Sequence, residues 1–272
     1  MPSLICSSRY TIDSQVLRKA AQALGWETLR LDGSQIPDWF DPPDDQIAFF
    51  YTAPHVFAIG RQLGRTLLGC NPDWAVNLPA ELLRRELHQM TLAEAIDSIS
   101  HHFVKHAVSK AFPAAVYDRP ALIEATSKVH PRSLVHVGEP VRWTHEFRCF
   151  VAQGQVMTLS PYVYDGAIVA DYDSFPAMTD EQLTEVTAFA SSVLEHPDVD
   201  YPAAFVLDVG KIDGRGWAVV ECNECWASGI YACNPAAVLE TLLCGNAVSN
   251  TMQSSKWDYA KHYALACPSL AE

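Results

Sequence analysis

The stretch FVLDVGKIDGRGWAVVECN, residues 205–223, has the pattern of a β-hairpin. Two apolar runs flank an Asp-Gly turn, which is typical of tight hairpins. Glu221 and Asn223 are two residues apart, so their side chains point to the same face of a strand, and Asp208 can lie across the hairpin from them. Two carboxylates and an amide oxygen on one face suit a hard divalent cation such as Mg²⁺. We therefore predict a metal site at Asp208, Glu221 and Asn223.

Each of these acids has a simpler interpretation when it is taken alone. Asp208 could be an ordinary strand-end residue, and Glu221 could be a solvated one. The apolar strands that carry them are expected to be buried, however, and a buried carboxylate needs a partner. The combined spacing therefore favours a metal site over isolated surface acids.

Two lysines precede this hairpin in the segment FVKHAVSKAF, residues 103–112. Lys105 interrupts an apolar strand, and a single lysine in such a place commonly extends to water from a strand edge. Lys105 and Lys110 together, upstream of a metal site, make a better phosphate clamp than either residue alone.

A charged pair lies within the apolar segment EFRCFV, residues 146–151. Glu146 and Arg148 are two residues apart and share a face of the expected strand. They could form an internal salt bridge. Alternatively, the carboxylate could bind a ribose diol, and the guanidinium could bind a phosphate or a substrate carboxylate.

The order of these motifs resembles the ATP-grasp superfamily: a lysine in a strand, an apolar strand leading to a hinge with a glutamate, E-x-R, then D and E-x-N across a hairpin. FVKHAVSKAF, EFRCFV and VVECNE look like the clade of small ATP-grasp proteins named for two arginines and a lysine. The resemblance covers roughly residues 75–245. It implies an α/β fold (α+β in its second part), with a pre-ATP-grasp domain at residues 1–80 and an ATP-grasp domain at residues 81–272.

The resemblance also implies roles for individual residues. Lys105 and Lys110 would hold the phosphates of ATP, backbone groups of the hinge would bind the adenine edge, and Glu146 would bind the ribose. Arg148 and Lys110 would be catalytic, and the acids of the hairpin would hold one or two Mg²⁺. The sequence lacks the glycine-rich loop that covers the phosphates in many ATP-grasp enzymes. The residues expected to bind ATP are Lys105, Lys110, His136, Val137, Glu139, Val141 and Glu146.

Membership of this superfamily implies an ADP-forming ligase that joins a carboxylate to an amine through an acyl phosphate. The substrates would be small molecules or peptides, and a homodimer is compatible with such an enzyme. A phosphotransferase on the same scaffold and a non-catalytic ATP-binding sensor are the alternatives. The presence of Asp208, Glu221 and Asn223 together favours an enzyme, since binding alone tolerates the loss of metal ligands. The residues that select the substrates are expected in the N-terminal domain and in loops at residues 165–178 and 223–231.

The composition narrows the class of protein further. The formal net charge is −13 over 272 residues, and such an acidic surface argues against nucleic acid or an anionic membrane as the main partner. The N-terminus lacks the pattern of a signal peptide, and no apolar run is long enough to span a membrane. Eight scattered cysteines are expected to be reduced, so we expect a cytoplasmic protein.

Periodicity and turn residues predict the local structure. A helix capped by Asp13 or Ser14 and another beginning at Pro54 should alternate with the first three strands in a parallel sheet, with a loop at residues 32–45. Thr91 and Glu94 have the spacing of a capping box, so a helix should begin there. The expected strands are 3–7, 27–31, 46–52, 102–107, 114–117, 134–137, 143–151, 155–162, 203–209 and 217–222. Further helices are expected at residues 80–90, 179–195 and 235–244.

Overall fold

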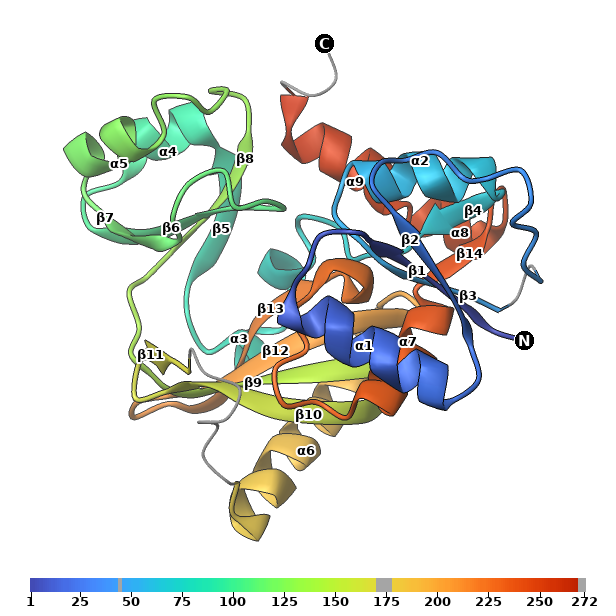
Figure 1. Ribbon diagram of the computed structural model, residues 1–272. Coiled ribbons are helices and arrows are strands. Elements are labelled where there is room, and N and C mark those ends of the chain that lie inside the picture. Colours follow the sequence, from blue (N-terminus) through green and yellow to red (C-terminus); the bar gives the residue numbers. More distant parts are fainter. Residues whose placement is uncertain (44–45, 170–177, 269–272) are drawn as a thin grey trace.

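The computed structural model describes residues 1–43, 46–169 and 178–268 (Figure 1). Of the loops predicted at residues 32–45 and 165–178, the parts at 44–45 and 170–177 lie outside the described residues. Within the described ranges, no helix has both the length and the apolar composition needed to cross a membrane.

A small parallel sheet forms the N-terminal unit, as the alternation of strands and helices predicts. β1 lies between β2 and β3 and is parallel to both. The cap predicted at Asp13 or Ser14 is wrong, because Thr11 has the extended backbone of a cap and its hydroxyl accepts the Ser14 amide. The elements of this unit are β1 (Ser3–Ser7), α1 (Ile12–Ala23), β2 (Glu27–Leu31), β3 (Ile47–Phe50), α2 (His55–Gln62) and β4 (Arg65–Leu67).

A small lobe follows, built on an antiparallel sheet with the order β5-β8-β6-β7. Helices α4 and α5 cover one face of this sheet (Figure 1), where they pack on Val104, Val135 and Val137. The capping box of Thr91 and Glu94 is confirmed at the start of α4. The elements of the lobe are β5 (Leu87–Thr91), α4 (Leu92–Ser98), β6 (His102–His106), β7 (Ala115–Tyr117), α5 (Arg119–Ala125) and β8 (Leu134–Gly138).

The helix predicted at residues 80–90 is wrong beyond its first turn. Only Ala80–Leu83 is helical (α3), and Arg84 then takes a left-handed backbone with φ of 50°. Residues 87–91 form β5, antiparallel to β8. Most residues of the segment 80–90 are good helix formers. Strand pairing with β8 therefore outweighs the local preference of this segment for a helix.

The large sheet contains both predicted hairpins. β9 and β10 form the first hairpin, and β12 and β13 form the second. The order is β11-β10-β9-β12-β13, so β9 and β12 are interior strands. The elements are β9 (Trp143–Ala152), β10 (Gln155–Tyr164), β11 (Ala167–Ile168), α6 (Asp180–Leu194), β12 (Ala204–Ile212) and β13 (Gly216–Asn223).

Apolar layers cover both faces of the large sheet. On one face, α6 packs over Phe147 and Phe205. On the other face, Phe150 and Val206 share a core with α7 (Pro235–Cys244) and with the N-terminal unit. Because the interior strands are buried on both faces, any charged residue on them must find a partner within the protein.

The C-terminal segment returns to the N-terminal unit. β14 pairs antiparallel with β4, and Tyr259 and Tyr263 of α9 pack against Phe57 of α2. The division of the chain at residue 80 stays a prediction. The remaining elements are η1 (Ala75–Asn77), η3 (Cys225–Ala227), β14 (Asn246–Val248), α8 (Met252–Lys256) and α9 (Tyr259–Ala266).

Trp226 belongs to the core that joins the N-terminal unit to the large sheet, and its substitution tests the importance of this core. Its side chain is fully buried, its ring packs against Phe57 and Tyr259, and its Nε1 donates to the Leu68 carbonyl at 2.9 Å. Trp226→Ala should lower the free energy of unfolding by about 3–5 kcal/mol because it leaves a large cavity. Urea denaturation measures this change.

Trp39→Ala is the matched control, because the Trp39 side chain is 69% exposed. Its loss should change the free energy of unfolding by less than about 1 kcal/mol. Equal losses for the two variants would contradict the central place given to Trp226.

Candidate active site

An ion pair joins the small lobe to the large sheet. The Lys105 ammonium on β6 contacts the Glu221 carboxylate on β13. Burial opposes the charge on Glu221, but Lys105 and the Asn223 amide outweigh it and lower the pKa of Glu221 to about 2. A predicted phosphate ligand and a predicted metal ligand therefore face each other, and Glu221 is ionised at neutral pH.

The three predicted metal ligands form one hydrogen-bonded group, which we name the carboxylate cluster. Asp208 and Glu221 are partners across β12 and β13, and Asn223 Nδ2 donates to Glu221 Oε1 at 2.9 Å and to Asp208 Oδ2 at 3.1 Å. The oxygen donors of this cluster fit a hard divalent cation. Among the described residues, no group of three or more His, Cys, Asp or Glu side chains could hold a metal, and the predicted donor set has two carboxylates and the amide of Asn223.

Arg148 is tied to this cluster through a buried ion pair. β9 and β12 align Arg148 with Asp208, and the guanidinium donates from Nε to Oδ1 at 3.0 Å and from Nη2 to Oδ2 at 2.7 Å. The Asp208 carboxylate is fully buried. Arg148 Nη1 also donates to the Gly229 carbonyl at 3.1 Å. Such a bidentate pair fixes the geometry of both groups.

Two stacked tyrosines lie against the Arg148 guanidinium. The rings of Tyr162 and Tyr231 are 5.2 Å apart and 11° from parallel, and Arg148 Cζ lies 5.4 and 5.0 Å from their centres. Burial opposes the charge on Arg148, but Asp208 outweighs it and raises the pKa of the arginine further. Sequence reasoning did not single out either tyrosine, because they come from separate segments that meet only in the fold.

Glu146 lies on the same strand as Arg148 but makes a different contact. It accepts a hydrogen bond from the Tyr162 hydroxyl at 2.6 Å. Burial raises the pKa of Glu146 to about 7, and the nearby charges of Asp208 and Glu221 act in the same direction. Burial therefore favours the protonated form of this carboxyl group more than in an exposed glutamate, and its role with a ribose stays a prediction.

Arg85 is a half-buried cation near this site that the sequence did not indicate. Its guanidinium donates to the carbonyls of Val219 and Val220 at 2.5 and 2.7 Å and lies 5.0 Å from the Trp143 ring centre. Burial lowers its pKa to about 10, although Glu146 and other acids oppose this. The residue falls in the segment wrongly predicted as a helix, so no sequence signal could have placed it here.

The beginning of the predicted adenine hinge is part of a regular sheet. β8 is paired with β5 and β6 at His136 and Val137. The Val137 side chain is buried in the core of the lobe. The buried His136 ring donates from Nε2 to the Pro72 carbonyl at 2.7 Å. Backbone groups of His136 and Val137 are used in pairing with the two neighbouring strands. If the hinge binds adenine, backbone groups after the end of β8 are therefore better placed to do so.

Glu139 and Val141 follow the end of β8. The Glu139 carboxylate forms an ion pair with Arg215 on the second hairpin and accepts the Glu86 amide at 3.1 Å. The Val141 side chain is half-buried. Glu139 thus fixes the position of the hinge relative to the large sheet.

Lys110 is not part of the carboxylate cluster. It is exposed in the loop after β6 and lines a cavity together with His106 and Lys128. Within the described ranges it forms no ion pair with the cluster. The fold therefore brings Lys105, but not Lys110, into contact with the predicted metal ligands.

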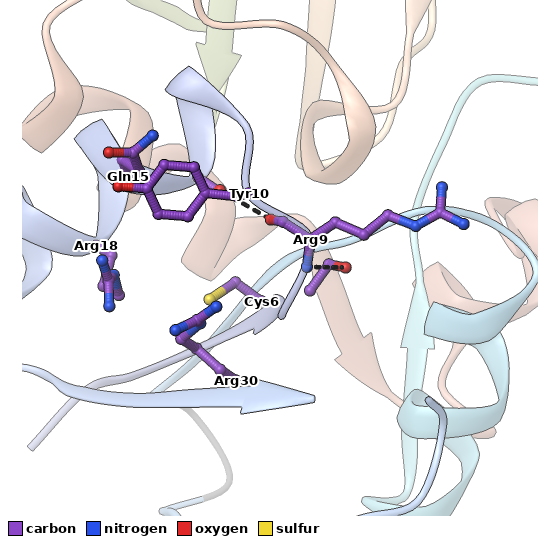
Figure 2. Close-up of a pocket in the computed structure, with 8 residues that line it drawn as sticks. Cys6, Arg9, Tyr10, Gln15, Arg18 and Arg30 are labelled. Carbon is purple, nitrogen blue, oxygen red and sulfur yellow. Dashed lines mark hydrogen bonds between the residues drawn. The ribbon is translucent and has the colours of Figure 1, made fainter. Parts of the chain in front are cut away.

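A second, much smaller pocket lies at the C-terminal end of β1. Figure 2 shows Arg18 and Arg30 beside Cys6, whereas Arg9 extends away from them. Arg30 donates to the Ser8 carbonyl at 2.8 Å. The pocket has a volume of about 10 Å³, which is about the space of one water molecule, so it cannot hold a nucleotide.

This geometry agrees with the family that the sequence matches. The model of the ATP-grasp domain, family 2 of the clade named for two arginines and a lysine, matches residues 82–241. The chain therefore belongs to this clade of the ATP-grasp superfamily, as the motif order indicated. None of the curated proteins matches the sequence.

Solved structures share the fold at low sequence identity. D-cycloserine synthetase DcsG has a TM-score of 0.52 and 13% identity over 89% of this chain and 98% of that one. D-alanine–D-alanine ligase from Bacillus anthracis has a TM-score of 0.52 and 11% identity over 90% of this chain and 97% of that one. These likenesses confirm the ATP-grasp fold.

Two buried histidines near Lys105 make stability depend on pH. Burial, together with the charge of Lys105, lowers the pKa of His106 and of His136 to about 4. In the unfolded chain, the pKa of a histidine is about 6.5. Between about pH 6.5 and pH 4, the unfolded state therefore binds more protons than the folded state. As the pH falls through this range, each histidine should lower the free energy of unfolding by about 1 kcal/mol per pH unit.

Urea denaturation between about pH 7 and pH 4.5 measures this slope. His106→Gln should remove the contribution of one histidine to the slope of the free energy of unfolding against pH. His101→Gln, at an exposed position, should keep the wild-type slope. Glu146 and other acids titrate in all three proteins, so the comparison isolates the imidazole. A wild-type slope in His106→Gln would contradict the assignment.

Proposed function

We propose that this protein is an ATP-dependent ligase that joins a carboxylate to an amine, forms ADP and acts through an acyl phosphate. The observation that carries the proposal is the contact between Lys105 on the small lobe and a carboxylate cluster on the large sheet that is also bonded to Arg148. A cation for phosphate, oxygen donors for a metal and a second cation for the reacting group therefore lie together.

Family membership and the fold support this proposal. Solved structures with the same fold include a D-alanine–D-alanine ligase and a D-cycloserine synthetase. The reaction proposed for this chain is of the same general kind, with a small molecule or a peptide as the carboxylate. The identity of both substrates, a cytoplasmic location and a homodimer stay predictions.

The nucleotide would lie between the small lobe and the large sheet. Lys105 would bind its phosphates, Glu146 would bind the ribose, and backbone groups at Glu139 and Val141 would bind the adenine edge. Lys110 lies in a different cavity and is not assigned to the nucleotide in this proposal. Asp208, Glu221 and Asn223 would hold Mg²⁺, which supplies charge neutralisation for the triphosphate when it is bound. Glu221 is suited to this role because its low pKa keeps it ionised.

The reaction consists of two displacements. In the first, a carboxylate oxygen attacks the γ-phosphorus of ATP, ADP leaves, and an acyl phosphate forms. Arg148 would stabilise the negative charge of the transferring phosphoryl group and of the acyl phosphate. In the second, the amine nitrogen attacks the acyl carbon, inorganic phosphate leaves, and the amine loses a proton to solvent.

A phosphotransferase is the second candidate. It is favoured because every role proposed for the clustered residues concerns phosphoryl transfer, while none is proposed for binding an amine. A non-catalytic ATP-binding sensor is the third candidate. The complete carboxylate cluster argues against the sensor, since binding alone tolerates the loss of metal ligands.

Heavy-oxygen labelling separates these functions. Carboxylates labelled in both oxygens are incubated with Mg²⁺, ATP and a panel of amines, and the released phosphate is analysed by mass spectrometry. For a ligase, one labelled oxygen should appear in inorganic phosphate, because the carboxylate oxygen stays bonded to phosphorus when the amine attacks carbon. A kinase would keep the label in a phosphorylated product, and a sensor would release no ADP.

Glu221→Gln tests the metal assignment. The variant should fold, because glutamine still accepts a hydrogen bond from Lys105, but it should lose Mg²⁺-dependent ADP release. It should also lose the extra stabilisation against heat that Mg²⁺ with ATP gives over ATP with EDTA, since a ligand that binds the native state raises its melting temperature.

Glu195→Gln is the matched control, because this residue is exposed at the end of α6. It makes the same chemical change away from the site and should keep both properties. If Glu221→Gln released ADP at the wild-type rate, the metal site would be in the wrong place.

A further inference from the structure

A cavity of about 600 Å³ lies between the small lobe and the C-terminal helix α9. Figure 1 shows the lobe and α9 facing each other above the large sheet. The walls are formed by the loop after β6, by the end of α5 with the loop that follows it, and by α9. A cavity of this size is in the range of sites that bind small molecules, roughly 300–1,000 Å³.

The lining of this cavity is basic, although the whole chain is acidic. Lys110 and Lys128 lie on walls formed by two different loops. No aspartate or glutamate is among the described residues that line it, whereas the chain has a net charge of −13. Ser109, Ser133 and Tyr263 add hydroxyl groups to the lining. The cavity is thus suited to an anion rather than to a cation.

His130 supplies a further hydrogen-bond donor. Its Nδ1 accepts the Arg132 amide at 3.1 Å, so in the neutral ring the proton is on Nε2. The ring lines the cavity, where this proton can be donated to a ligand.

The cavity is separate from the candidate active site. On β6, the Lys105 side chain points to Glu221, and the next residue, His106, points to the opposite face of the strand. There it packs against Phe112 and lines the cavity. Neither Arg148 nor the carboxylate cluster is among the lining residues.

Among the described residues, polar contacts connect α9 and Cys267 to the small lobe. The Tyr259 hydroxyl donates to the Val108 carbonyl at 3.4 Å, and Cys267 Sγ lies 3.8 Å from His106 Nε2. The rings of α9 pack instead on α2 in the N-terminal unit. A ligand in the cavity would therefore touch both the small lobe and α9.

We propose that this cavity binds a phosphate-bearing small molecule at a site separate from the nucleotide. Lys110 and Lys128 supply the compensating charge, and phosphate oxygens can accept hydrogen bonds from several hydroxyl and imidazole donors at once. Because its walls belong to the small lobe and to α9, the bound anion holds the lobe against the N-terminal unit. The inference rests on the cavity alone and does not depend on the ligase activity.

Isothermal titration calorimetry with inorganic pyrophosphate tests this site. The full chain is titrated at constant ionic strength with EDTA present, so that no metal takes part. The wild type should bind pyrophosphate, and Lys128→Glu should weaken binding at least about tenfold, because attraction becomes repulsion. Lys19→Glu, the same charge change at an exposed residue of α1, should keep the wild-type affinity.

Hydrogen exchange with and without pyrophosphate locates the bound anion. Protection at residues 106–111, 126–133 and 263–267 supports the proposal. Protection confined to residues 208 and 221–223 would place the anion in the candidate active site and overturn it. No binding to the wild type, or equal affinity in wild type and Lys128→Glu, would overturn it as well. Since Lys128 is exposed, an unchanged melting temperature should confirm that the variant is folded.

Discussion

The candidate active site depends on the buried ion pair between Arg148 and Asp208. A fully buried carboxylate is costly unless it is paired, and the two hydrogen bonds from the guanidinium fulfil this need. The pair links two interior strands of the large sheet, so it fixes the side chains of both. A buried pair of this kind is weak evidence for added stability, and its value here is geometric: it holds Asp208 where Asn223 can reach it.

From this pair, a continuous network of polar contacts extends to the small lobe. Asn223 connects Asp208 to Glu221, and Glu221 pairs with Lys105 on β6. The network therefore begins at buried residues of the large sheet and ends on the small lobe. Its outer members, Lys105 and Glu221, are partly exposed to solvent. In the proposed function, the charges that neutralise one another in this network would also bind the nucleotide and the metal.

The resemblance of the motif order to the ATP-grasp superfamily implied the fold, and residue patterns predicted both hairpins and the grouping of Asp208, Glu221 and Asn223. Strand geometry explains the success of the residue patterns. Side chains two residues apart share a face, and a tight turn fixes which residues of a hairpin lie opposite each other. The alternation of strands and helices likewise predicted the parallel sheet at the N-terminus. All of these relations are local in the chain, so a pattern of a few residues carries them.

Contacts between distant segments were settled by tertiary packing. Leu87, Gln89 and Met90 are good helix formers, but pairing with β8 makes residues 87–91 a strand, and this change places Arg85 beside the large sheet. The tyrosines against Arg148 come from separate segments, and Lys110 lies with Lys128 in a cavity rather than with Lys105. No spacing rule predicts such contacts, because they depend on how the small lobe, the large sheet and α9 pack together. The sequence thus specified the chemistry on each strand, and packing decided which groups meet.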